Sequence, residues 1–594
     1  MKTKLQILKL LILLCSVFTT TFVFGQTTYT WTGAGDGASY GNATNWDPMG
    51  IPMGCVPGDI AQWDGRTTTN LFITCNITGF ICDPFGPVGL SFLLTANQTN
   101  SVQIISPVAL SSSLSLFGIT NNSSNAPFIL GNGSANVLSI TMRPAGATHD
   151  WVNNSTNPTV IYPNVRWQAG GGAIYTLIFD GTGNWIVTNG LNNSGVGTVL
   201  AKQGTGTLTW AGPSIPNAMG FSPISSPFTI GGGTVVLAWA DTFLNNVAIA
   251  NNGALLKYDA PAQSQTLNGV ISGTGALQVN NGTLTLGGQN TYCGTNILSG
   301  GVLVVNSAEN PGFFGPLGVT NTIWFNGGTL GFSVNDVYDY SSRFSTAAGQ
   351  AYSIDTGGQS VTFATGLTSS GGSLTKFGAG TLTLAGANTY SGATTVSAGK
   401  LMFQGPKSGF GNITVADGAA LGITATGTQV TPGTLTLGTS SGCTMEFNNV
   451  NSTTTAPLAA ATLSPAGTIT VNINSGTFTV GQSYPLLIWA TTGSAPSVSL
   501  GALNGALGNL AIVGNAVKLN ITGLVAPPTL IFTNLGNSIQ FSWTGAFKLQ
   551  SQTNGLNVGL GTNWADYSGG STSPVTVLMD ALNESVCFRL VSTP

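Results

Sequence analysis

The densest cluster of ionisable residues in this chain is the segment Asp336-Val-Tyr-Asp339-Tyr340, with Arg343 and Asp355 nearby. Two close carboxylates can bind calcium or act as general acid and base, and neighbouring tyrosines could line a groove for a sugar. A catalytic role here would be the cleavage of a polysaccharide, with Asp336, Asp339 and Asp355 as the candidate catalytic residues. The alternative, which the sequence favours, is a solvated insertion between two structural units.

Aromatic residues are concentrated between residues 29 and 63. The candidates for binding a glycan are Trp31, Tyr40, Trp46 and Trp63, with Tyr29 beside them. Exposed aromatic rings can stack on the faces of sugars, and the surrounding asparagines and threonines can bond to hydroxyl groups. The competing interpretation is that these rings pack together and close one end of the fold.

Other kinds of chemistry have few residues to support them. His149 is the single histidine, and the dipeptide His149-Asp150 alone is typical of a loop. The cysteines form no Cys-x-x-Cys pair, so neither a zinc site nor a redox site is indicated. No phosphate-binding loop, calcium-binding loop or nucleophile elbow is present. We therefore expect no metal and no cofactor.

The composition excludes further classes of protein. The chain has 594 residues, of which only 6% are charged, with 15 Lys+Arg and 18 Asp+Glu. A soluble globular protein has about a quarter charged residues. No basic stripe is available to neutralise phosphates, so nucleic acid is not an expected partner. A hydrophobic content of 42% is ample for a core and argues against disorder.

The N-terminal segment 1–25 is predicted to be a secretory signal peptide. Lys2, Lys4 and Lys9 form a basic start, the segment 10–17 is apolar, and a cleavage site precedes Gln26. No later stretch is long and apolar enough to cross a bilayer, so the mature chain is expected to have no membrane span.

Short runs that alternate threonine with an apolar residue recur along the chain. Each begins at a glycine: Gly206-Thr-Leu-Thr-Trp210, Gly282-Thr-Leu-Thr-Leu286, Gly380-Thr-Leu-Thr-Leu384 and Gly433-Thr-Leu-Thr-Leu437. Alternation with a period of two points one set of side chains inward and the other outward, as in a β-strand. Glycine, asparagine and serine fill the gaps and suit tight turns. The pattern predicts an all-β fold.

These runs belong to a larger internal repeat. Residues 275–303 and 372–401 are two clear copies, and a degenerate copy begins at Lys202 and resumes at Gly231. The segment 372–401 resembles the autotransporter-associated β-strand repeat, whose signature contains Gly-x-Leu-x-Lys-x-Gly-x-Gly-x-Leu-x-Leu and Asn-Thr-Tyr-x-Gly. The resemblance implies a right-handed parallel β-helix, or β-solenoid, that forms a passenger on the surface of a Gram-negative bacterium. Autotransporters end in a membrane barrel, and we expect this chain to resemble relatives that lack the barrel.

A change of pattern at Ala526-Pro527-Pro528 predicts a domain boundary. About six short strands follow, enough for a small sandwich. This part resembles a fibronectin-like module through four motifs: Ser542-Trp543, Leu549 to Asn554, Gly559 to Trp564, and Phe588 to Leu590. The predicted organisation is a signal peptide (1–25), an N-terminal β cap region (26–130), a parallel β-helix (131–525) and a C-terminal β-sandwich module (527–594).

Two functions remain open from the sequence. The favoured one is a non-catalytic secreted or cell-surface β-helix that serves in attachment or in matrix or fibre assembly. Its expected partners are polysaccharides or other cell-surface components, or further copies of itself. The alternative is a polysaccharide lyase or glycoside hydrolase on the same scaffold. A cleft with two close carboxylates and a base, for which Asp336 to Asp355 is the best candidate, would distinguish the second from the first.

Overall fold

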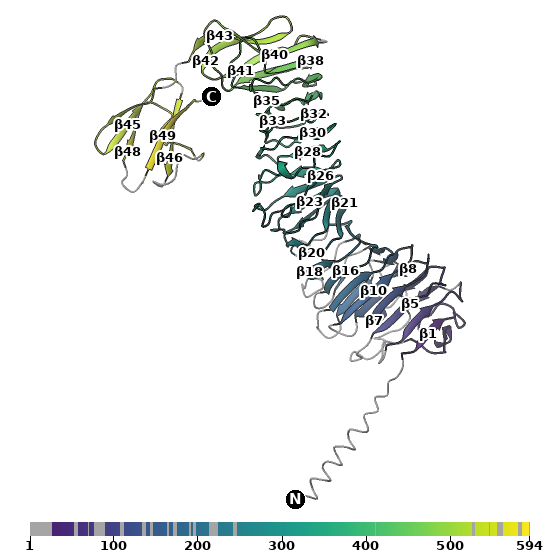
Figure 1. Cartoon of the computed structure of the whole chain (residues 1–594). Coiled ribbons are helices and arrows are strands. Elements are labelled where there is room, and N and C mark those ends of the chain that lie inside the picture. The colour runs from purple at the N-terminus through teal and green to yellow at the C-terminus, as the bar shows by residue number, and fades with distance from the viewer. Residues whose placement is uncertain are drawn as a thin grey trace, which may run out of the picture.

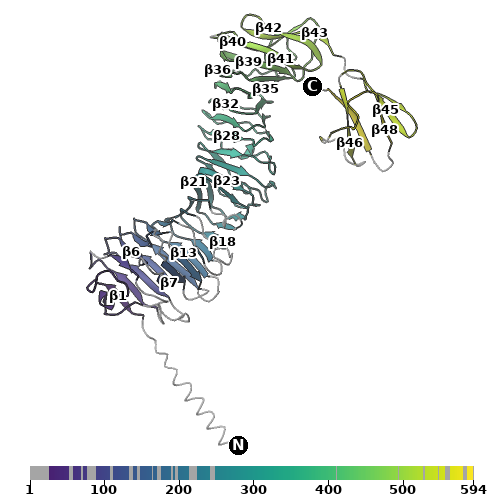
Figure 2. The same cartoon turned by 180° about the vertical axis from the view of Figure 1, so that it is seen from behind.

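The computed structural model describes residues 26–592 with internal gaps. The gaps are 53–57, 69–70, 76–88, 107–111, 133–137, 143–146, 163–164, 170–174, 189–191, 194–197, 213–223, 241–245, 247, 410, 493, 526–528, 546, 555–561, 563 and 580–584. The predicted signal peptide lies outside the described residues. Within them the chain is all-β, with short 3₁₀ turns such as η1 (Ala43–Asn45) and η4 (Ser341–Arg343) between strands. Figures 1 and 2 show a long, bent stack of coils.

Parallel strands on successive coils pair along the stack and form three long sheets. The first sheet contains β1 (Thr28–Trp31), β2 (Trp46–Asp47), β3 (Ile60–Trp63), β5 (Leu90–Leu94), β7 (Ser112–Asn121), β9 (Leu138–Met142), β10 (Thr148–Asn153), β12 (Val165–Ala169), β13 (Tyr175–Asp180), β15 (Asn192–Asn193), β16 (Thr198–Lys202), β18 (Ile224–Ile230), β20 (Ile249–Asn251) and β22 (Ile271–Ser272).

The second sheet runs along almost the whole stack. Its first part contains β4 (Phe72–Thr74), β6 (Val102–Ile105), β8 (Phe128–Leu130), β11 (Thr159–Ile161), β14 (Trp185–Val187), β17 (Thr207–Trp210), β19 (Thr234–Leu237), β21 (Leu255–Leu267), β23 (Ala276–Leu286), β24 (Asn296–Leu298), β25 (Val302–Val305), β26 (Ile323–Phe325) and β27 (Thr329–Gly331). It continues through β28 (Ala351–Asp355), β30 (Ser373–Phe377), β32 (Thr394–Val396), β34 (Ile413–Val415), β36 (Thr434–Leu437), β38 (Leu458–Pro465), β40 (Ser483–Thr492), β43 (Ala516–Leu524) and β42 (Ala506–Ile512).

The third sheet accompanies the second from the middle of the stack onward. It contains β29 (Ser360–Phe363), β31 (Thr381–Leu384), β33 (Lys400–Phe403), β35 (Ala420–Thr424), β37 (Thr444–Asn448), β39 (Thr468–Ile473) and β41 (Ser497–Leu503). The strands alternate buried and exposed residues, and one continuous core extends from Trp31 to Ile521. The predicted fold class, a parallel β-helix, is confirmed.

Coil length varies along the stack. Thr394 pairs with Ile413, whereas Thr148 pairs with Thr176, so the second of these coils is the longer one. Parallel pairing begins with Thr28 opposite Ile60, inside the segment 26–130 that the sequence assigns to a cap. Strands there alternate in the same way as later ones, so they stack as coils. The short strand β2, which pairs antiparallel to β1, is what interrupts the parallel order at this end.

Outward-facing hydroxyl groups form a ladder on the second sheet. Its side chains lie opposite one another on consecutive strands: Ser353, Thr375, Thr395, Thr414, Thr436 and Ser464. Neighbouring strands are about 4.8 Å apart, so each hydroxyl side chain of the ladder lies next to a hydroxyl side chain on the neighbouring strand. Like charges at that spacing would repel, and hydroxyl groups do not. A ladder of this kind explains why these outward positions carry no charge.

The residues of the repeat signature stabilise turns. Tyr390 is fully buried, and its hydroxyl lies 2.7 Å from Oγ1 of Thr394. Asn388 accepts a hydrogen bond from the Leu367 backbone amide of the preceding coil at 3.0 Å. Gly399 has a φ of 62°, and a Cβ there would lie 2.4 Å from the carbonyl oxygen of Gly380, so the turn requires glycine. The signature therefore specifies coil stacking.

Buried lysines close further turns. The Lys376 ammonium donates to the carbonyl oxygens of Phe377, Gly378 and Ala398 at 2.6, 2.7 and 3.2 Å. Lys202 and Lys407 donate to turn carbonyls in the same way. Burial lowers the pKa of each lysine to about 8.

The stack ends in antiparallel strands, and a separate module follows. β40 pairs antiparallel with β43, which pairs antiparallel with β42. Among the described residues, no helix has the length and apolar character that a membrane span requires.

The C-terminal module has two sheets. One contains β44 (Ile531–Asn534), β45 (Ser538–Ser542) and β48 (Val575–Leu578), and the other contains β46 (Phe547–Asn554), β47 (Ala565–Asp566) and β49 (Ser585–Ser592). Phe541, Trp543 and Leu549 form its core, as expected for a small sandwich. Figure 1 labels β45, β46, β48 and β49 of this module. Most of the predicted motif Gly559 to Trp564 lies outside the described residues.

We predict that Lys376→Met destabilises the stack by about 1–3 kcal/mol, because the carbonyl oxygens of Phe377, Gly378 and Ala398 lose the ammonium as a donor. Between the folded pKa of about 8 and the ordinary value of 10.5, the unfolded chain binds more protons than the folded one. The free energy of unfolding contributed by Lys376 therefore rises with pH in this window. In urea unfolding, the difference in free energy of unfolding between wild type and variant should be larger at about pH 10 than at about pH 7. Lys518→Met, on a half-buried lysine of β43, is the control. A difference independent of pH would contradict the prediction.

Candidate functional site

Two long loops interrupt an otherwise regular part of the stack. The turns 287–295, 385–393 and 425–433 between strands are short and equal in length. The corresponding segments 306–322 and 332–350 are much longer. Insertions in a solenoid map to its surface and often mark the binding face. The candidate site is therefore this pair of adjacent insertions, which contains most of the ionisable cluster seen in the sequence.

Arg343 fastens the two insertions together. Its Nε donates to the Asn321 carbonyl oxygen at 3.1 Å, and its Nη1 to Gly318 O at 3.2 Å and Glu309 Oε1 at 3.4 Å. Its Nη2 donates to Leu317 O at 2.6 Å and to Asn321 Oδ1. A guanidinium has five N–H groups, so these five contacts use all of them.

A buried carboxyl pair lies beside this arginine. The Tyr340 hydroxyl is 2.6 Å from Asp336 Oδ2 and 3.0 Å from Glu309 Oε2. A phenol has one proton and can donate to only one carboxyl group at a time, so the second contact needs a proton from a carboxyl group. Burial raises the pKa of both Glu309 and Asp336, which favours such a protonated carboxyl group. The pair acts as part of the fastening between the loops.

The three aspartates proposed from the sequence do not form one site. Asp336 is 4% exposed and contacts the Tyr340 hydroxyl, which also contacts Glu309. Asp339 accepts hydrogen bonds from the backbone amides of Ser341 and Ala364, at 2.9 and 2.7 Å. Asp355 accepts one from the Gly357 amide at 2.9 Å.

Each of the three aspartates thus has a contact partner of its own in the structure, and their catalytic role stays a hypothesis from the sequence. The Glu309 side chain is 2% exposed and Asp336 is 4% exposed, so both carboxyl groups are enclosed by the protein. The described residues also contain no group of three or more side chains suited to hold a metal ion. Sequence reasoning missed Glu309 because it lies on the preceding insertion, and the length of that insertion was the available signal.

The N-terminal aromatic residues are also placed differently from the glycan-binding hypothesis. Trp31, Tyr40, Trp46 and Trp63 are each at most 2% exposed. Trp46 packs edge-to-face on the other three, with ring centroids at 4.9, 5.1 and 5.8 Å, and its Nε1 donates to Tyr40 O at 3.0 Å. This burial agrees with the competing interpretation, in which the rings pack together at the end of the stack, and glycan binding by these rings stays a prediction.

A groove opens beside the insertions. It has a volume of about 530 Å³, and its lining includes Thr320, Thr322, Trp324, Ser342, Arg343 and Thr346. Trp324 is the central residue of β26 and is 37% exposed, while Ile323 and Phe325 on either side are buried. The groove thus combines an accessible indole with hydroxyl groups from both insertions.

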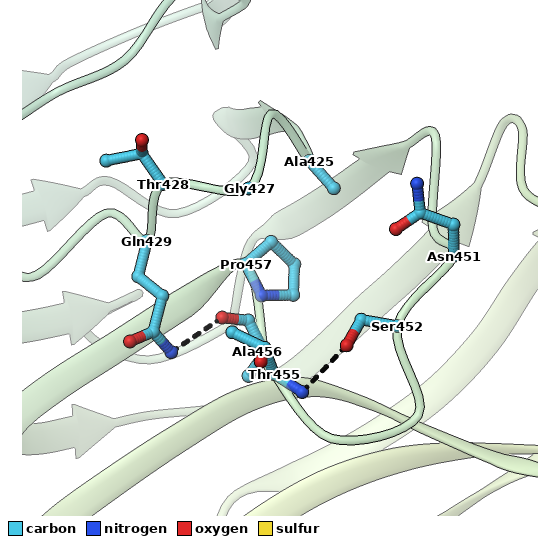
Figure 3. Close-up of a pocket in the computed structure, with 9 residues that line it drawn as sticks. All are labelled: Ala425, Gly427, Thr428, Gln429, Asn451, Ser452, Thr455, Ala456 and Pro457. Carbon is cyan, nitrogen blue, oxygen red and sulfur yellow. Dashed lines mark hydrogen bonds between the residues drawn. The ribbon is translucent and has the colours of Figure 1, made fainter.

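Two other hollows lack carboxylate and basic side chains. The first, of about 140 Å³, lies between turns of consecutive coils, where Gln429 donates to Ala456 O at 2.8 Å and the Thr455 amide to Ser452 Oγ at 2.9 Å (Figure 3). The second, of about 370 Å³, lies in the C-terminal module and is lined by apolar residues such as Ile539 and Phe588.

Comparison with known proteins identifies the repeat. A family model described as passenger-associated-transport-repeat matches residues 277–305 and 374–402. These segments coincide with the two clear copies of the repeat, so the resemblance to an autotransporter passenger is confirmed. No curated protein and no solved structure gives a match.

We predict that Arg343→Met loosens both insertions. The carbonyl oxygens of Leu317, Gly318 and Asn321 would lose the guanidinium as a donor. Buried Glu309 would lose its counter-charge, and the two losses together should cost about 3 kcal/mol or more. Glu309→Gln removes the charge but can still bond to the Tyr340 hydroxyl, so its cost should be smaller. Limited proteolysis between residues 306 and 350, together with thermal unfolding, measures the difference. Equal resistance of Arg343→Met and wild type to cleavage would refute the fastening role.

For the N-terminal aromatic cluster, Trp46→Ala should lower stability by about 3–5 kcal/mol because it removes a buried ring from a packed cluster. Circular dichroism would follow the melting temperature, and a binding assay at low temperature would follow any glycan affinity. Loss of glycan binding without a change in melting temperature would instead support the glycan-binding hypothesis for these rings.

Proposed function

We propose that this passenger-type β-helix is a non-catalytic protein of the bacterial cell surface that attaches to extracellular polysaccharide. The passenger repeat implies exposure at the surface of a Gram-negative bacterium. The predicted signal peptide, residues 1–25, is consistent with export. The remaining question is what the exported stack does.

The main support for the proposal is that the ionisable side chains make structural contacts within the protein. The best catalytic candidate, Asp336, is buried with Glu309 and bonded to Tyr340, and Arg343 has all its donors occupied. Elsewhere Lys400 pairs with Glu446 at 2.7 Å, across strands of the third sheet. These groups contribute to stacking and loop closure, which supports a scaffold over an enzyme.

The surface of the stack suits a neutral polymer. The hydroxyl ladder from Ser353 to Ser464 offers donors and acceptors at regular spacing and carries no charge. An extended stack also places a binding surface away from the cell. Both features support attachment to uncharged polysaccharide.

Self-association is a second candidate, supported by one feature. β42, the last strand of the second sheet, exposes Leu507 at 59%, and Val513 and Leu524 nearby are 54% and 52% exposed. Exposed apolar residues at a sheet edge favour pairing with another copy.

The proposal predicts sedimentation with polysaccharide without cleavage. Mature protein, residues 26–594, would be incubated with insoluble plant and algal polysaccharides, and each sample assayed for co-sedimentation and for new chain ends. We expect co-sedimentation and no new ends above the buffer control. Protein without glycan, at several concentrations, serves as the control and reports self-association. Chain ends released in proportion to protein through successive purification steps would instead support the lyase or hydrolase alternative.

A further inference from the structure

Strand geometry places Trp324 on the outer surface. β26 lies next to β24, with Ile297 opposite Trp324, and β24 lies next to β23, with Gln278 opposite Ile297. Because Ile323 and Phe325 point into the core, alternation along the strand directs Trp324 outward. Trp185 and Trp210 are at most 1% exposed, whereas Trp239, on another coil, is 39% exposed. Trp324 thus departs from the use of tryptophan as core filling.

The groove beside Trp324 contains one charged side chain, and the contacts of that side chain lie within the protein. Arg343 lines it, but its five N–H groups already donate within the two insertions. Glu309, at 3.4 Å, offsets its charge. A carboxylate or phosphate ligand would find no unused guanidinium donor here. The groove therefore does not select for an acidic ligand.

Hydroxyl groups surround the indole. Thr320, Thr322, Ser342 and Thr346 are exposed, and their side-chain hydroxyls form no hydrogen bond within the described part of the chain. Each can both donate and accept. Together with an aromatic face, such groups match a ligand that has apolar ring faces and many hydroxyl groups.

We propose that this groove binds a neutral polysaccharide, with one sugar ring stacked on the Trp324 indole and its hydroxyls bonded by the threonines and serine around it. The inference rests on the proposed attachment function and gives it a site and a ligand class. A volume of about 530 Å³ lies within the range of ligand sites, about 300–1,000 Å³.

The insertions hold this groove in shape before the ligand arrives. Arg343 joins segment 317–321 to η4, and the Ser345 amide donates to Ile323 O at 2.8 Å, next to Trp324. Side chains fixed in this way lose little conformational freedom on binding. Binding should thus depend on Trp324 without reorganisation of the coil.

The test compares three variants of the mature chain by affinity electrophoresis and titration calorimetry. Trp324→Ala removes the stacking face, Trp324→Phe keeps part of it, and Trp239→Ala removes a tryptophan that is similarly exposed, at 39%, on another coil. The neutral probes are laminarin, mannan and xyloglucan, and the acidic probes are alginate and polygalacturonate.

We expect Trp324→Ala to weaken binding of at least one neutral probe about tenfold or more, Trp324→Phe to weaken it less, and Trp239→Ala to leave it unchanged. Equal melting temperatures would establish that all three variants are folded. Unchanged binding by Trp324→Ala would contradict the groove as the binding site but would leave the proposed attachment function in place. A preference for the acidic probes would have the same consequence. Absence of binding to any probe would overturn the groove and remove the polysaccharide partner from the proposed function.

Discussion

The structure depends on backbone hydrogen bonding between consecutive coils in register. Once strands pair in parallel at a fixed spacing, every residue lies above and below its counterparts on neighbouring coils. Apolar ladders then fill the core, hydroxyl ladders cover the outside, and stacked like charges are excluded. The chain has few charged residues, and several of those described have structural tasks, as Lys376 does for three turn carbonyls.

Sequence reasoning predicted the parts of the fold that repeat. The Thr-Leu-Thr-Leu runs identify outward and inward positions without any knowledge of distant contacts, and the Asn-Thr-Tyr motif identifies the turns. It was less successful where segments meet across coils. Glu309 and Asp336 lie on separate insertions, and their shared contact with Tyr340 could not be derived from spacing. The burial of Trp63 could have been foreseen from the alternation of Ile60-Ala-Gln-Trp63, which places Ala61 and Trp63 on the same inner face.

The regular coils and the two insertions have different roles in the molecule. The regular coils provide length and a neutral surface, and their side chains are committed to stacking. The insertions add side chains that are free of that constraint. Part of each insertion, through Arg343 and the buried carboxyl pair, holds the loops rigid, which leaves Trp324 and its neighbouring hydroxyls accessible. In the proposed function, a cluster that looks catalytic in sequence supports a neighbouring binding surface.

Hydrogen–deuterium exchange on the full mature chain, with and without a neutral polysaccharide, tests most directly whether this surface is preformed. Some backbone amides of residues 306–322 and 332–350, such as that of Ser345, donate hydrogen bonds to neighbouring backbone. If the surface is preformed, these amides should exchange as slowly as those of adjacent strands before any ligand is added. Ligand should then slow exchange further around residues 320–324 and 342–347. Exchange of both insertions at the rate of an unstructured loop would contradict a rigid platform and the function built on it.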